Sequence, residues 1–124
     1  MALHIDVELQ RGLLLVTASG SLVFDVAVRR LRHVFDIAAE KQINKILVNC
    51  LVLDGELSTF KWYGLGVAVA AYLRQREMNP QLAIVGKPPT IDGFGVLVAQ
   101  NRGVTTEVFS SRQAALNWLD KYPS

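Results

Sequence analysis

The sequence contains a single cysteine, Cys50, so one chain cannot form an internal disulfide. This excludes the disulfide-stabilised scaffolds of small secreted proteins and makes the reducing cytoplasm the expected location. A long hydrophobic run is also missing. The least polar stretch, residues 63–73, is interrupted by Gly64 and Gly66 and is well short of the about 20 residues that span a membrane. The opening residues, MALHIDVEL, lack the pattern of a signal peptide. We therefore expect no membrane span.

The sequence has little net charge and few metal-binding side chains. Its 13 basic and 11 acidic residues give a formal charge of +2, which is too small and too dispersed to indicate nucleic-acid binding. The two histidines are far apart and have no cysteine at zinc-ligand spacing, so we expect no metal. The glycines of Gly64-Leu65-Gly66 do not form a dinucleotide fingerprint, since no strand directly precedes them and the third glycine is missing. We expect no cofactor.

The chain does have enough apolar residues, 51% of 124, to form one domain over residues 1–124 with a buried core. Alternating or continuous apolar residues predict strands over His4–Leu9, Leu13–Ala18, Lys45–Cys50, Leu82–Val85 and Thr105–Phe109. Residues 51–57 are predicted to be a loop, because Asp54-Gly55 favours a turn.

Apolar residues at spacings of three and four, together with capping residues, predict the helices. They are expected over Asp25–Lys41, from Ser58 to about Glu77, from Thr90 or Asp92 to Gly103, and after a capping box of Ser110 and Gln113.

The resulting order is β-β-α-β-α-β-α-β-α. Strands that alternate with helices indicate an α/β domain with a mostly parallel sheet, here of about five strands flanked by about four helices. The first strand follows a short turn and should pair antiparallel at an edge, so the sheet is predicted to be mixed.

Glycines within predicted helices indicate close packing. Each costs a helix about 1 kcal/mol relative to alanine, so Gly64 and Gly66 predict that their helix lies tight against the sheet or a second subunit. Together with the aromatic residues of this helix they also suggest a homodimer. Gly93 and Gly95 allow the same packing interpretation, or an anion site at a helix start.

Two side-chain groups are candidate functional residues on the second predicted helix. Ser58 and Thr59 stand at its start, where a hydroxyl caps the helix or accepts a phosphate. The aromatic residues of this helix belong to the core, to an apolar pocket or to an interface, where such residues are favoured. They are Phe60, Trp62, Tyr63 and Tyr72.

Cys50 is the one candidate nucleophile. It ends a buried strand, and free cysteines are mostly small core residues, although a strand end leaves a reactive thiol open as an alternative. We find no paired acid and base, so we expect no enzyme and no catalytic residue.

Several segments together resemble a known family over nearly the whole chain. They are KILVNC, DGELSTFKWYGLG, QLAIVG, FGVLVAQNRG, EVF and AALNWL. The sequence resembles the SpoIIAA-like group of STAS domains, the anti-sigma-factor antagonist fold, and is also similar to the lipid-binding domain of Sec14-type proteins. The most specific parts are the turn at residues 100–103 and the ending from Val108-Phe109 to Trp118-Leu119.

The resemblance implies a phosphorylated serine at the start of the second helix, modified in antagonists by an anti-sigma-factor kinase. In that family the serine lies in a compact Asp-Ser-Ser-Gly motif after a strand. Here the strand ends Asn49-Cys50 and a longer loop follows, so Ser58 and Thr59 are the hydroxyls near the helix start. With Asp54 in the loop, they are the candidate residues for phosphorylation or partner contact.

These observations predict a non-enzymatic, STAS-like regulatory or binding module. It is expected to contact a regulatory protein partner through the loop Asp54–Thr59 and the second helix. The alternative is a carrier or sensor of a lipid or small apolar ligand, which the aromatic residues and the Sec14-type resemblance both favour.

Overall fold

The computed structural model describes residues 1–123 and has the predicted order of strands and helices. Its elements are β1 (His4–Gln10), β2 (Leu13–Ser21), α1 (Phe24–Lys41), β3 (Lys45–Asp54), α2 (Thr59–Gln75), β4 (Gln81–Val85), α3 (Phe94–Asn101), β5 (Thr105–Phe109) and α4 (Arg112–Leu119).

The five strands form one mixed sheet in the order β1-β2-β3-β4-β5. β1 pairs antiparallel with β2, from His4 opposite Ser19 to Gln10 opposite Leu13, and the remaining pairs are parallel. The α/β fold class and the antiparallel edge strand are therefore confirmed. The outward residues of β1 are polar, and the His4 ring bonds Asp6 at 3.1 Å on the exposed side of this edge.

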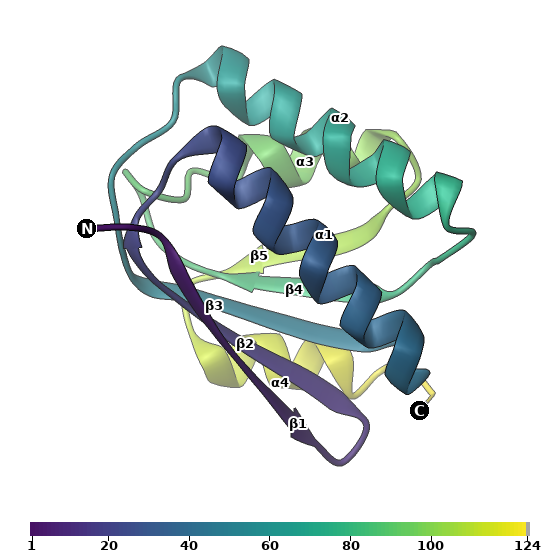
Figure 1. Cartoon of the computed structure of the whole chain (residues 1–124). Helices are drawn as coiled ribbons and strands as arrows, with labels where there is room; N and C mark the ends of the chain where they lie inside the picture. Colours follow the sequence, from purple (N-terminus) through teal and green to yellow (C-terminus); the bar gives the residue numbers. More distant parts are fainter. Residues whose placement is uncertain (124) are drawn as a thin grey trace.

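The helices cover the two faces of the sheet unequally (Figure 1): α1, α2 and α3 lie on one face and α4 on the other. The larger core lies under the three helices and includes Phe35, Ala38 and Ile46, which are fully buried. The smaller core lies under α4 and includes Leu47 and Ala115.

The crossover helices α1, α2 and α3 all lie on one face, which has a consequence for ligand binding. In open α/β sheets the usual ligand crevice forms where successive crossovers go to opposite faces. The described strands follow one another in sequence order without such a switch. A binding site in this protein must therefore lie between the helices and the sheet, or on the surface.

β3 is longer than predicted, because Leu51–Asp54 continues the strand where a loop was expected. The pairing shifts along this part: Asn49 lies opposite Thr17, whereas Val52 lies opposite Ser19, so β3 carries an extra residue. Such a bulge breaks the alternation of side chains on which sequence prediction relies. The loop before α2 is thus residues 55–58 instead of the predicted 51–57.

The helix starts agree with the sequence only in part. Ser58 caps α2 as predicted. The cap of α1 is Val23, not Asp25, and it makes no side-chain bond to the helix. The cap of α4 is Ser111, whose hydroxyl accepts from the Ala114 amide at 3.2 Å, so the predicted box at Ser110 was one residue early.

Gly66 and Gly95 bring α2 and α3 into close contact. A Cβ atom at Gly66 would lie 2.7 Å from the Gly95 carbonyl oxygen and 2.8 Å from the Val98 Cβ atom. A Cβ at Gly95 would lie 2.8 Å from Cε3 of Trp62. The predicted close packing is present, but its partner is α3 rather than the sheet.

We predict that Gly66→Ala destabilises the protein by about 1–2 kcal/mol, since overpacking against rigid backbone outweighs the gain in helix propensity. Gly64→Ala is the matched control, because its Cβ would meet only the Phe24 ring, at 3.3 Å. Urea unfolding should show the control to be near neutral. Equal stability of the two variants would contradict the tight α2–α3 contact.

Candidate functional site

The first candidate site is the start of α2, at the carboxyl end of β3 (Figure 1). Asp54 ends β3, and its carbonyl oxygen accepts from the Leu22 amide at 2.8 Å, which ties β3 to the turn before α1. The Ser58 hydroxyl accepts from the Lys61 amide at 3.2 Å. Ser58, Thr59 and Lys61 are exposed, so the hydroxyls are accessible beside a basic side chain at a helix N-terminus.

Exposed apolar side chains lie at the same end of the molecule. Phe60 in the first turn of α2 is 82% exposed, Val52 near the end of β3 is 63% exposed, and Val23 before α1 is 48% exposed. We call Phe60 and Val23, with Ser58 and Thr59, the α2 N-terminal surface. Val52 points to the other face of the sheet, because its neighbour Leu53 is buried in the larger core. Exposed large apolar residues that gather beside polar groups are typical of interaction sites.

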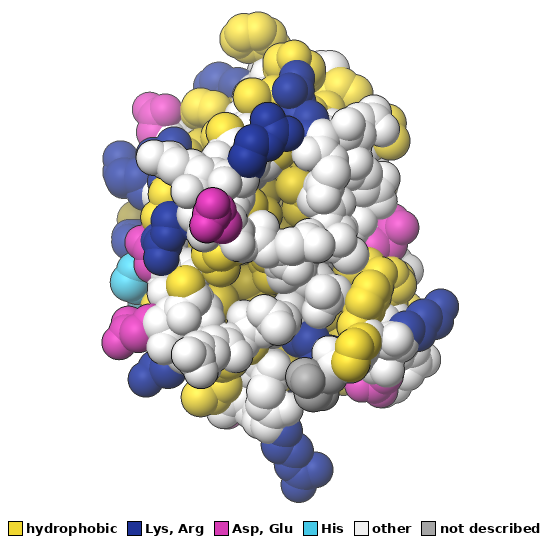
Figure 2. Space-filling model, turned by 90° about the vertical axis from the view of Figure 1, so that its right-hand side faces the viewer, with side chains coloured by type: hydrophobic (Ala, Val, Ile, Leu, Met, Phe, Trp, Pro, Cys, Tyr) yellow, Lys and Arg dark blue, Asp and Glu magenta, His cyan; other side chains and the backbone are white. Residues whose placement is uncertain are grey.

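The opposite end of the molecule, where α1 and α2 finish, has a different character. Figure 2 faces this end and shows charged side chains around a hollow with hydrophobic side chains in its floor. A hollow there is lined by residues that include Ala38, Ile43, Met78 and Pro80. Its lining has one carboxylate, Glu77, and no cation, cysteine or histidine, so it offers little for chemistry.

The structure separates the four aromatic residues of α2. Trp62 is buried, whereas Phe60 and Tyr63 are exposed, and the Tyr63 hydroxyl accepts from Arg102 at 3.0 Å. Tyr72 is half-buried at the contact with α1. They do not share one pocket, because Phe60 and Tyr63 face the solvent whereas Trp62, two positions after Phe60, faces the core.

Tyr72 belongs to a polar contact between α1 and α2. Its ring stacks on Phe35 with centroids 6.4 Å apart, and its hydroxyl donates to Asp36. The Arg76 guanidinium donates to the same carboxylate, and Arg32 lies over the Tyr72 ring at 5.4 Å. These contacts fix the two helices to each other and give Tyr72 a structural role.

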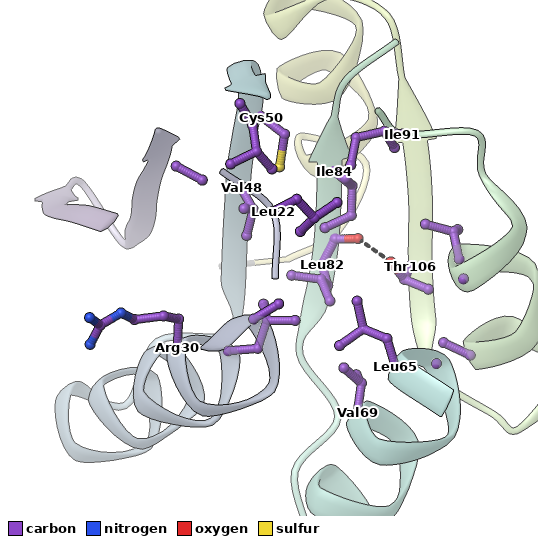
Figure 3. A pocket seen from close by; sticks show the side chains of 18 of the residues that line it. Leu22, Arg30, Val48, Cys50, Leu65, Val69, Leu82, Ile84, Ile91 and Thr106 are labelled. Carbon is purple, nitrogen blue, oxygen red and sulfur yellow. Dashed lines mark hydrogen bonds between the residues drawn. The ribbon is translucent and has the colours of Figure 1, made fainter. Parts of the chain in front are cut away.

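The second candidate site is a cavity of about 120 Å³ between the sheet and the helices α1, α2 and α3. Figure 3 shows side chains from β3, β4, α1 and α2 that line it, and the Arg30 side chain points away from it. Its lining residues include Leu22, Val48, Cys50, Trp62, Leu65, Val69, Leu82, Ile84, Ile91, Ala99 and Thr106. The wall is almost wholly apolar.

The cavity volume restricts what could bind. Pockets for drug-sized ligands measure about 300–1,000 Å³, and a cavity of about 150 Å³ admits benzene. At about 120 Å³ the cavity fits one small ring and is far too small for a phospholipid. The Sec14-type resemblance therefore does not extend to a lipid-sized chamber.

Cys50 lines this cavity, and its thiol is buried. Burial raises the pKa of the thiol to about 12, so it is protonated at neutral pH and is a poor nucleophile. Among residues 1–123, no three His, Cys, Asp or Glu side chains lie close enough to hold a metal ion. Over the same residues, no helix is long and apolar enough to cross a membrane.

Comparison with known proteins places the fold. No family model matches the sequence, and no curated protein does. Among solved structures, an anti-sigma factor antagonist from Mycobacterium paratuberculosis is similar with a TM-score of 0.66 and 14% identity over 96% of this chain and 95% of that one. An uncharacterized DUF3478-family protein with a SpoIIAA-like fold from Shewanella loihica PV-4 has a TM-score of 0.54 and 19% identity over 94% and 93%. The chain thus has the SpoIIAA-like fold of STAS domains.

We predict that Ser58→Ala lowers the free energy of unfolding by about 1 kcal/mol, because it removes the α2 cap. Ser58→Asp should keep most of the stability, since a carboxylate accepts the same hydrogen bond from the Lys61 amide and is favourable at a helix N-terminus. Thr59→Ala is the control, because Thr59 is exposed and lies inside the helix. Chemical denaturation distinguishes the variants, and full stability of Ser58→Ala would show that the observed cap contributes nothing.

The buried thiol predicts a loss of stability at high pH. At a pH below the ordinary thiol pKa of 9.0, Cys50 is protonated in both the folded and the unfolded protein. Between pH 9 and the folded-state pKa of about 12, the thiol ionises only in the unfolded protein, which stabilises the unfolded state. Between pH 8 and pH 10 the wild type should therefore lose about 1 kcal/mol more than Cys50→Ala. Parallel pH dependence of the two proteins would show that the thiol is not desolvated.

Proposed function

We propose that this protein is a non-enzymatic regulatory module that binds a protein partner through the α2 N-terminal surface. The observation that carries the proposal is the exposed Phe60, which projects from the first turn of α2 beside two accessible hydroxyls. The fold is consistent with this role, since a structure of the same fold is that of an anti-sigma factor antagonist. The protonated, buried Cys50 supports a role without catalysis.

Phosphorylation of this surface is the proposed switch. A phosphate on Ser58 or Thr59 would gain from the free amides and positive end of α2 and from nearby Lys61. It would add charge directly beside Phe60, and so change an apolar contact into a strongly anionic one. Phosphopeptide mapping of protein from its native cell tests both hydroxyls.

The proposed module acts in the cytoplasm, which fits its single cysteine. A homodimer is also proposed, although the glycines that suggested it lie against α3 or the Phe24 ring within the chain. The exposed Tyr63 and Phe60 remain available on α2 for contact with another copy. Sedimentation velocity at high concentration measures this association directly.

A second candidate function is the carrier or sensor of a small apolar ligand. The specific observation that favours it is the cavity of about 120 Å³ under α2. Its size restricts the proposed ligand to a molecule of about one ring and excludes a phospholipid held inside the domain.

We predict that Phe60→Ser reduces capture of the native partner about tenfold without loss of stability, because a central exposed aromatic residue is a typical hot spot. Leu9→Ser is the matched control, since Leu9 is 53% exposed at the far end of β1. Cross-linking in the native cell followed by quantitative mass spectrometry compares the two. Equal partner capture by wild type and Phe60→Ser would refute this surface.

A further inference from the structure

The helices α1 and α2 end next to each other at the hollow that Figure 2 faces, which we call the helix-end hollow. Both helices end in the same way. The Ile43 amide donates to the Ala38 carbonyl oxygen at 2.9 Å, and the Met78 amide donates to the Leu73 carbonyl oxygen at 2.9 Å. These bonds define a Schellman motif, in which the residue directly before the donor adopts the left-handed conformation.

The left-handed position of each motif holds a residue that is unusual there. Glycine, or sometimes asparagine, normally takes this position, whereas this protein has Gln42 with a φ of 57° and Glu77 with a φ of 55°. A residue with a Cβ atom adopts this conformation at a cost in free energy. Among residues 1–123, the one other non-glycine residue with a positive φ is Arg11, which lies in the turn between β1 and β2. Backbone strain of this kind clusters at functional sites.

Gln42 and Glu77 both line the helix-end hollow, which has a volume of about 310 Å³. This volume is within the range of about 300–1,000 Å³ that is typical of ligand pockets. The lining combines an apolar floor with polar side chains that can form hydrogen bonds. The apolar part includes Ala38, Ile43, Met78 and Pro80, and the other polar side chains are those of Asn44 and Asn79.

A carboxylate and the ends of two helices make this hollow attractive to a cation. Glu77 is the one ionisable side chain among its lining residues. The C-terminus of a helix carries a partial negative charge, and both α1 and α2 end here. Lys41 and Arg76, which directly precede Gln42 and Glu77, are not lining residues, and the Arg76 guanidinium donates to Asp36 between the helices. The hollow therefore has negative charge without a cation of its own in its lining.

We infer that the helix-end hollow binds a small organic amine in its cationic form. The ammonium group donates to the Glu77 carboxylate and to the amide oxygen of Gln42, and the apolar body of the amine covers the floor. Binding explains why two side chains are kept where glycine would cost less. The site lies at the opposite end of the molecule from the α2 N-terminal surface, and it is separate from the cavity between the helices and the sheet.

The test uses three probes of similar size that differ in charge: benzylamine, benzyl alcohol and phenylacetate. Each is titrated at pH 7 into the purified full chain while backbone amide peaks are followed by NMR. We expect benzylamine to bind about fivefold more tightly than benzyl alcohol, as for one exposed ion pair, and phenylacetate to bind least. The amide peaks of Ile43, Asn44 and Met78 should move, whereas that of Phe60 at the other end of α2 should stay in place.

Two substitutions remove the same charge at different places. Glu77→Gln keeps the size of the side chain and should lower benzylamine affinity about fivefold, to the level of benzyl alcohol. Glu56→Gln is the matched control, because Glu56 is exposed in the loop before α2 and does not line the hollow. It should leave the affinity for all three probes unchanged.

Glycine substitutions separate the binding role from a structural one. Gln42→Gly and Glu77→Gly relieve the left-handed strain, so each should raise the urea midpoint of unfolding while it weakens benzylamine binding. A lower midpoint in both variants would show that the two side chains are kept for stability, and it would overturn the argument from strain.

The titrations decide the rest of the inference. Failure of benzylamine to bind at millimolar concentration, or equal affinity for all three probes, overturns the amine site. Equal loss of benzylamine affinity in Glu77→Gln and Glu56→Gln would show only a general effect of charge and would remove the role of Glu77. Partner capture by the α2 N-terminal surface is measured separately, so these results leave the proposed function unaffected.

Discussion

The contact between Gly66 and Gly95 is the constraint on which the rest of the structure depends. With no side chain on either residue, α2 approaches α3 until a Cβ at Gly66 would lie 2.7 Å from a carbonyl oxygen. This approach holds Trp62 against Gly95 and fixes the position of α2 and α3 over the larger core. Both glycines are also among the residues that line the cavity between the helices and the sheet.

α2 presents two different chemistries from one short segment. Phe60 faces outward and is 82% exposed, whereas Trp62, two positions later, is 7% exposed. The outer side offers a large apolar group among hydroxyls, which suits a protein partner. The inner side packs into the larger core, where the Trp62 ring lies close to Gly95 of α3. A single helical turn thus joins the proposed partner surface to the packing of the core.

The sequence could predict the order of elements, because strand and helix periods differ strongly. The end of α2 was predicted near Glu77 from Asn79-Pro80, whereas the helix ends at Gln75 and Glu77 turns the chain with a positive φ. It could not predict the end of β3, since the bulge near Cys50 breaks the alternation and exposes both Leu51 and Val52. Ser58 was identifiable as a cap because a helical pattern begins directly after it. The cavity was not identifiable, because it depends on distances between helices that are far apart in the chain. Helical geometry alone could have separated Phe60 from Trp62, since residues two apart lie about 200° apart around the axis.

The polar outer side of β1 limits how copies of this protein can associate. An edge strand has unpaired backbone groups that invite a strand from another molecule, and charged side chains on it oppose such pairing. Here His4, Asp6 and Glu8 are all exposed along β1. A continuous sheet running through two copies would have to desolvate these groups. Growth by edge-to-edge addition, the usual route from a small sheet to a fibril, is thus disfavoured at this edge.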